Sequence, residues 1–93
     1  MIAVSMVAAN VYEIVIEGVG PDNIETIHRV HMSQAYYREL CGATATHEYV
    51  LVQAVQFLLE KEPNTSILAE FDLPDIERYF PGFEAEIKSR LKR

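Results

Sequence analysis

The sequence predicts a single α+β domain, mostly α, spanning residues 1–93. Apolar and polar residues alternate over residues 11–17, as in a half-buried strand, whereas later segments repeat apolar residues at helical spacing. Hydrophobic residues make up 49% of the chain and charged residues 24%, which is the composition of a folded protein. The chain is too short for two independent cores, so we expect a strand and two-helix core over residues 1–62 and a proline-punctuated helical segment over 63–93.

The strand predicted at residues 11–17 has five β-branched or aromatic residues among its seven. Its alternation puts Tyr12, Ile14 and Ile16 on one face. Residues 2–8 fit either a hairpin partner or an extension. The two residues between these segments make a poor hairpin turn, so an intermolecular ribbon with a second molecule is the other interpretation.

The segment after the Gly18, Gly20 and Pro21 turn predicts a long helix, because Asp22 or Asn23 can cap one that ends near Cys41. Gly42 then supplies the left-handed residue that often follows a helix. The helix would carry two apolar stripes, one formed by Ile24, Met32, Ala35, Tyr36 and Leu40, the other by Ile27, Val30, Tyr37 and Cys41. Two stripes indicate burial on two sides, one of them against a partner.

The next helix is predicted to begin at Thr44 or Thr46 and to run to about Glu62, before Pro63. Its polar strip is narrow, so most of its surface must be enclosed. A chain this short offers little to enclose it, which favours an obligate homodimer. The residues that we expect in the core or the dimer interface are Tyr12, Ile14, Ile16, Ile27, Val30, Tyr37, Val50, Val52, Val55 and Leu59.

The last third of the chain predicts short helices over residues 66–71, 73–80 and 83–92, separated by prolines and a glycine. Asp72 can cap the second of them. Residues 65–71 also fit a strand.

The charge distribution argues against nucleic acid as a partner. The chain has a net charge of −6, and four of its eight basic residues lie among the last six, so residues 1–87 carry fourteen acidic and four basic groups. Nucleic-acid binding depends on basic groups that neutralise phosphates. We therefore expect a homodimer with a basic protein partner, and neither nucleic acid nor a membrane.

Candidate chemistry is sparse. Glu25, His28 and His31 follow one another at i, i+3 spacing on the predicted helix, a spacing also found in carboxylate-bridged di-iron bundles, so they are the candidate metal ligands. The alternative is that both histidines are ordinary hydrogen-bonded or surface residues. Cys41 and His47 invite a thiolate–imidazole interpretation, but the negative end of a helix disfavours a thiolate. No residue stands out as catalytic or cofactor-binding, so we expect no cofactor and no enzymatic activity.

The order of strand, helix, glycine turn and helix resembles the ribbon-helix-helix family. The matching residues are Gly42, Thr44, Thr46, Glu48, Tyr49, Val50, Ala54, Phe57, Leu58, Leu59 and Glu60, and the resemblance covers residues 11–62 at most. It implies an intertwined homodimer that acts as a transcriptional repressor or antitoxin. The family reads DNA with polar or basic strand residues, whereas neither face of residues 11–17 offers a cation.

Together these patterns predict a small, non-enzymatic regulatory or adaptor protein that acts as a homodimer. A ribbon-helix-helix repressor or antitoxin is the first alternative, and a small metal-binding or catalytic dimer is the second. A single cysteine fits the reducing cytoplasm, and residues 1–9 lack the basic start of a signal peptide.

Overall fold

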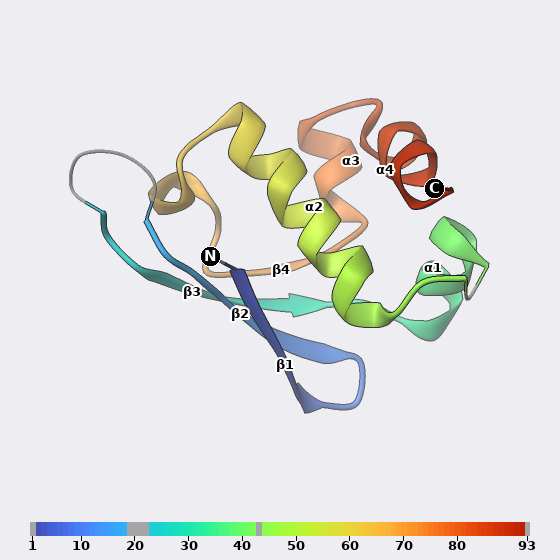
Figure 1. Ribbon diagram of the computed structural model, residues 1–93, viewed down its shortest axis with the longest axis horizontal. Helices are drawn as coiled ribbons and strands as arrows, with labels where there is room; N and C mark the ends of the chain where they lie inside the picture. Colours follow the sequence, from blue (N-terminus) through green and yellow to red (C-terminus); the bar gives the residue numbers. More distant parts are fainter. Residues whose placement is uncertain (1, 19–22, 43, 93) are drawn as a thin grey trace.

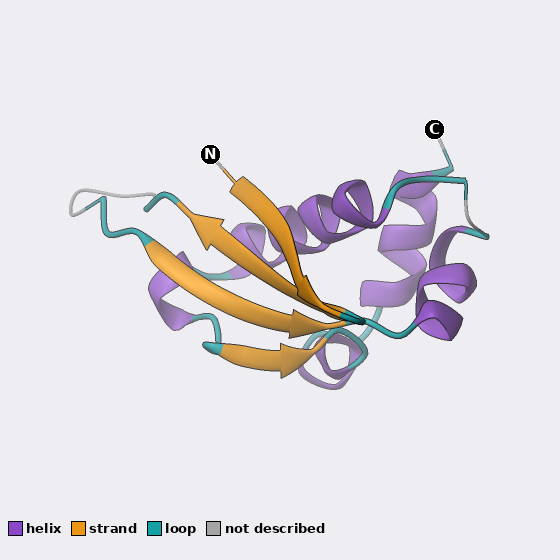
Figure 2. Cartoon of the chain, turned by 90° about the horizontal axis from the view of Figure 1, so that it is seen from below, coloured by secondary structure: helices purple, strands orange, loops and turns teal. Residues whose placement is uncertain are grey.

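The computed structural model describes residues 2–18, 23–42 and 44–92, and it shows an α+β fold. Among these residues 47% are helical and 26% lie in strands. Figure 1 gives the course of the chain. In Figure 2 the strands lie in front of the helices, so the helices pack on one face of the sheet and no described segment covers its other face.

The sheet has four strands in the order β1-β2-β3-β4. They are β1 (Ile2–Ala8), β2 (Val11–Ile16), β3 (Thr26–His31) and β4 (Glu70–Asp72). β2 runs antiparallel to both β1 and β3, whereas β4 runs parallel to β3. The two edges of the sheet are therefore formed by residues from opposite ends of the chain.

The N-terminal hairpin settles the alternatives for residues 2–8. β1 pairs with β2 of the same chain, and Asn10 turns the chain with a φ of 62°, a left-handed conformation that asparagine tolerates. The strand predicted over residues 11–17 is confirmed as β2. β2 is paired on both edges by strands of its own chain, so in this structure it is not the free strand that the intermolecular ribbon and the ribbon-helix-helix resemblance both imply.

The long helix predicted from Asp22 or Asn23 to Cys41 is wrong. The structure has β3 there, followed by the short helix α1 (Gln34–Cys41). Burial in β3 alternates with a period of two because its inward residues face the core, and the Ser33 side chain then accepts the Tyr36 N–H to start α1. The predicted end at Gly42 is confirmed by its φ of 60°. The predicted Gly20-Pro21 turn and the Asp22 cap lie outside the described residues.

The second predicted helix is confirmed as α2 (His47–Lys61). The Thr46 hydroxyl caps it by accepting the Tyr49 N–H. The helix predicted over residues 66–71 is wrong: the 3-10 turn η1 (Asn64–Ser66) and the strand β4 occupy this region, so the strand interpretation holds for Glu70–Asp72.

Two short helices complete the chain, α3 (Asp75–Tyr79) and α4 (Phe83–Leu91), close to the predicted segments. Asp72 does not cap α3, because it belongs to β4 and Pro74 stands at the cap position. The Glu77 carboxylate reaches forward from α3 and accepts the N–H groups of Gly82 and Glu84, each at 2.8 Å. These bonds satisfy donors at the start of α4 that have no partner within the helix.

The core lies between the sheet and the helices α2 and α4. Ile14 and Phe83 have no exposed surface, and Leu51 of α2 is equally enclosed. Of the residues expected in the core or interface, the structure buries Tyr12, Ile14, Ile16, Val30, Tyr37, Val50 and Val55 and leaves Val52 and Leu59 half-buried. Ile27 corrects the prediction: it is 56% exposed because it lies on the opposite face of β3 from Val30. One chain therefore encloses most of α2 without a partner.

Candidate interaction surface

The three candidate metal ligands do not come together. His28 and His31 belong to a strand and not to a helix, and an odd spacing puts them on opposite faces of the sheet. His31 lies on the uncovered face, where its Nε2 is 2.7 Å from the Glu70 carboxylate, and the Glu25 side chain is exposed just before β3. No group of three potential metal ligands forms among residues 2–18, 23–42 and 44–92.

His28 instead belongs to a buried hydrogen-bond network. Its Nδ1 lies 2.7 Å from the Leu68 carbonyl, and its Nε2 lies 2.8 Å from the Thr26 hydroxyl. Because a carbonyl can only accept, Nδ1 carries a proton, and in the neutral imidazole Nε2 then accepts from the Thr26 hydroxyl. The Asn64 amide donates to that hydroxyl and to the Ile24 carbonyl, both at 2.8 Å. Each ring nitrogen is thus occupied, and the network ties β3 to the segment around η1.

Cys41 and His47 do not form a thiol–imidazole pair. The Cys41 thiol donates to the Tyr37 carbonyl at 3.5 Å, and the His47 Nε2 lies 3.1 Å from the Gln34 amide oxygen. The His47 ring stacks on Tyr37, with ring centroids 3.8 Å apart. Burial, followed by the neighbouring thiol, raises the pKa of Tyr37, whose hydroxyl donates to the Ala45 carbonyl. These groups join α1 to the start of α2 and leave no nucleophile activated by a base.

The most unusual exposed feature is the free edge of β1. Apart from its ladder with β2, no hydrogen bond or ion pair from the described chain reaches residues 2–8. The strand is seven residues long and carries no charge, and Met6 and Val7 are 60% and 46% exposed. Proteins usually protect an edge strand with charges, prolines or short length, and β1 has only a register shift between Met6 and Ala8. An edge of this kind is suited to pairing with another strand.

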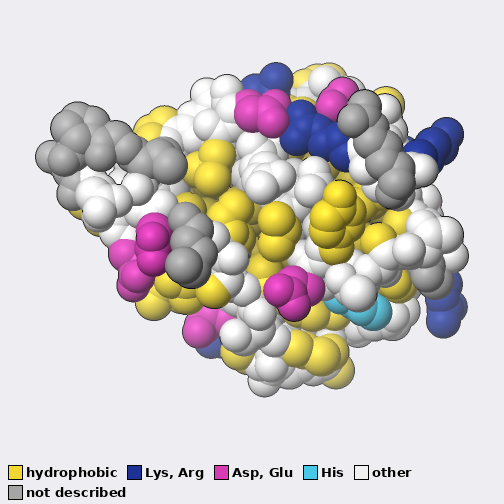
Figure 3. All heavy atoms as spheres, viewed as in Figure 1, with side chains coloured by type: hydrophobic (Ala, Val, Ile, Leu, Met, Phe, Trp, Pro, Cys, Tyr) yellow, Lys and Arg dark blue, Asp and Glu magenta, His cyan; other side chains and the backbone are white. Residues whose placement is uncertain are grey.

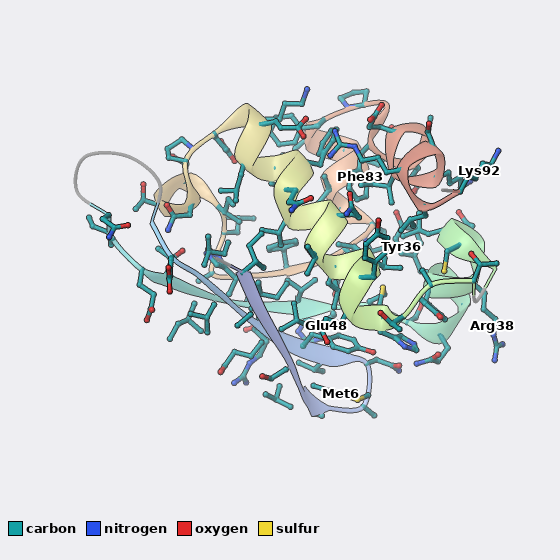
Figure 4. The ribbon with its side chains drawn as sticks, in the orientation of Figure 1. Met6, Tyr36, Arg38, Glu48, Phe83 and Lys92 are labelled. Atoms are coloured by element: carbon teal, nitrogen blue, oxygen red, sulfur yellow. The ribbon has the colours of Figure 1, made fainter. Side chains whose placement is uncertain are left out.

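Helix α2 extends this edge into a broader surface. It packs beside β1. Two of its residues point outward: Tyr49 is 44% exposed, and Val52 is half-buried. Figure 3 shows a band of hydrophobic side chains across the face on which α2 and β1 lie. Figure 4 places Met6 near the turn of the hairpin and Glu48 at the start of α2. We call the β1 edge with Tyr49 and Val52 the β1–α2 surface.

The opposite edge of the sheet is protected. β4 has only three residues, and Glu70 and Asp72 give it two negative charges. Short length and charge are both features that prevent pairing between edges. The two edges of the sheet therefore differ: β4 has the features that prevent pairing with another strand, and β1 lacks them.

Comparison of the chain with protein-family models, curated proteins and solved structures found no match. The described helices are all too short or too polar to cross a membrane. Sequence patterns alone missed both the β1 edge and the His28 network. The only available signal for the edge was the absence of charge from residues 1–12, and this becomes meaningful once β1 is known to lie outermost.

Proposed function

We propose that this protein is a small, non-enzymatic adaptor or regulatory protein that acts as a homodimer, and that two copies join through their β1 edges. The unprotected edge of β1 is the observation that carries the proposal. Antiparallel pairing of two β1 strands about a two-fold axis would satisfy the outward N–H and C=O groups of both strands. The result would be a continuous sheet of eight strands.

Charge favours this edge over other contacts. Each chain carries −6, so two copies repel each other over most of their surface. β1 has no charge, so its self-pairing would place no like charges directly opposite each other. Because a two-fold axis perpendicular to the sheet keeps all helices on one side, the two α2 helices would become neighbours. Tyr49 and Val52 would then lie close to the interface.

A binding role is further supported by the reactive side chains, because their hydrogen bonds hold the fold together. His28, His47 and Cys41 each have partners within the fold. The Thr26 hydroxyl lies 2.8 Å from the His28 Nε2, but it also accepts from the Asn64 amide, so both groups are engaged in the network that ties β3 to η1. The acidic body favours a basic protein as the partner of the dimer.

The mass in solution tests the proposed dimer. By light scattering at ~10 μM, we expect a particle of twice the 10.6 kDa chain mass, since stable interfaces hold at such concentrations. The variant Ser5→Lys/Val7→Lys should be a monomer, because the self-paired strands would bring four lysines together. It should still fold, since Ser5 lies opposite Glu13 and a lysine there gains an opposite charge.

The matched control is Ala35→Lys/Ala85→Lys, which makes the same charge change at two exposed helical positions. It should remain a dimer. A folded wild-type monomer at ~10 μM, or a dimer that survives the two β1 lysines, would show that the β1 edge is not the interface.

A further inference from the structure

A concave site lies next to β4, at the sheet edge opposite to β1. It is a pocket of about 380 Å³ between the C-terminal end of α2, η1, β4 and α3. Leu58, Ile67, Phe71 and Phe80 contribute apolar wall to it. Its volume lies within the range of ligand-binding pockets, roughly 300–1,000 Å³. Since β1 and β4 are opposite edges of the sheet, a dimer through β1 leaves this pocket open.

Two carboxylates also line the pocket. Glu62 is half-buried, and no hydrogen bond or ion pair from the described chain reaches its side chain. Asp75 has Arg78 at 3.7 Å, but that arginine is 78% exposed, so the pair is weak. An apolar cavity with an unpaired carboxylate favours a ligand that combines an apolar body with a positive charge.

The apolar surface continues beyond the cavity. Leu68 and Tyr79, which also line the pocket, are 53% and 63% exposed. A small amine inside the cavity would leave most of this surface in water, whereas a peptide could cover it. Protein interfaces commonly place one large apolar side chain in a pocket and surround it with polar contacts.

We propose that this pocket binds a basic segment of a partner protein, with a large apolar side chain in the cavity and lysine or arginine against Glu62 and Asp75. The inference rests on the proposed adaptor role, since it gives the chemistry of the partner. The occupant is a basic segment because the pocket contributes negative charge of its own to an already acidic body.

Defined peptides test the assignment. The probes are fluorescein-labelled hexapeptides with two large apolar residues at the centre and two lysines or arginines on each side. One matched set has alanine at the centre, and another has glutamate at the flanks. By fluorescence anisotropy we expect members of the basic apolar set to bind with a Kd tighter than about 1 mM, and both matched sets to bind at least about tenfold more weakly.

Two variants locate the binding. Glu62→Lys and Leu68→Lys should each weaken binding about tenfold, because each puts a positive charge at the pocket. Both should fold, since no described residue bonds to the Glu62 side chain and Leu68 is exposed. The control Glu39→Lys makes the same charge change as Glu62→Lys at an exposed position on α1 and should bind as the wild type does.

The assignment is overturned if no basic apolar peptide binds below about 1 mM, if the alanine or glutamate sets bind equally well, or if Glu62→Lys binds unchanged. It is also overturned if 4-phenylbutylammonium binds as tightly as the peptides, since the occupant would then be a small cation. Light scattering on the same samples separates the two proposals: a dimer that binds no peptide contradicts the pocket alone, and a monomer that binds contradicts the dimer alone.

Discussion

Replacing Asn64 with alanine should destabilise the fold strongly, although Asn64 lies in a short 3-10 turn. Its amide donates two hydrogen bonds of 2.8 Å, to the Ile24 carbonyl and the Thr26 hydroxyl, and the residue is only 2% exposed. A buried group that loses its partner costs about 1–3 kcal/mol. With two bonds lost, we expect the free energy of unfolding to fall by about 2–4 kcal/mol, a large share of the roughly 5–15 kcal/mol of a typical domain.

The assay is urea denaturation followed by circular dichroism at a fixed protein concentration, since dimerisation would make stability depend on concentration. The midpoint should fall without a change in the m-value. Because His28 and Asn64 both bond to the Thr26 hydroxyl, the double variant with His28→Ala should be non-additive by at least about 0.5 kcal/mol. The control Thr65→Ala, at the exposed next residue, should stay within about 0.5 kcal/mol. A loss below about 0.5 kcal/mol for Asn64→Ala, or strict additivity, would refute the network.

Three further changes test other parts of the fold. The backbone N–H groups at the start of α4 hold the pKa of the Glu77 carboxyl below its ordinary 4.5. Its contribution to folding stability is therefore present above pH 4.5 and is lost as the pH falls through the lowered pKa. Glu77→Gln should make the free energy of unfolding less dependent on pH in the acid range. Burial, and then the hydrogen bond to Glu84, raises the pKa of the Tyr36 hydroxyl above 10.0. Its contribution to folding stability is therefore present below pH 10 and is lost as the pH rises through the raised pKa. Tyr36→Phe should make the free energy of unfolding less dependent on pH in the alkaline range. Gly18→Ala should destabilise the protein by about 1–3 kcal/mol, because the added Cβ would meet the backbone of Ile24.

Chemical unfolding across a pH series checks the first two of these changes, and thermal unfolding checks the third. Glu13→Gln is the matched control for Glu77→Gln, because the Glu13 carboxylate accepts no backbone N–H from the described residues and has only Arg29 at 3.7 Å. Tyr79→Phe is the control for Tyr36→Phe, because Tyr79 is 63% exposed. A Glu77→Gln or Tyr36→Phe profile that runs parallel to the wild type at every pH would contradict the assigned titration. An unchanged Tm for Gly18→Ala would mean that the backbone there has room for a side chain.

The elements whose patterns are local could be read from the sequence. The alternation in β2 and the threonine cap of α2 both depend on neighbouring residues, and both predictions are confirmed. The helix predicted over β3 is wrong because the apolar residues around Val30 fit both the 3.6-residue period of a helix and the two-residue period of a strand. What decides the strand is pairing with β2 and β4, and β4 lies about 40 residues further along the chain.

The same limit applies to the candidate sites. The metal hypothesis for Glu25, His28 and His31 depended on a helix, and it fails where a strand forms. His28 bonds to the Leu68 carbonyl and to the Thr26 hydroxyl, which also accepts from the Asn64 amide, and no local pattern connects Leu68 or Asn64 to His28. Likewise, an uncharged segment such as β1 becomes a candidate interface only when its place at the edge is known. Local patterns specify elements, whereas sites depend on contacts between distant segments.

The parallel pairing of β3 with β4 has a consequence for synthesis on the ribosome. The hairpins from β1 to β3 are local and can form early, but β4 emerges about 40 residues after its partner. At roughly 5–20 residues per second, translation needs about 2–8 s to cover that distance. During this interval the nascent chain presents two open sheet edges, and His28 lacks its carbonyl acceptor. The early chain is therefore most prone to self-association before Glu70–Asp72 has been made.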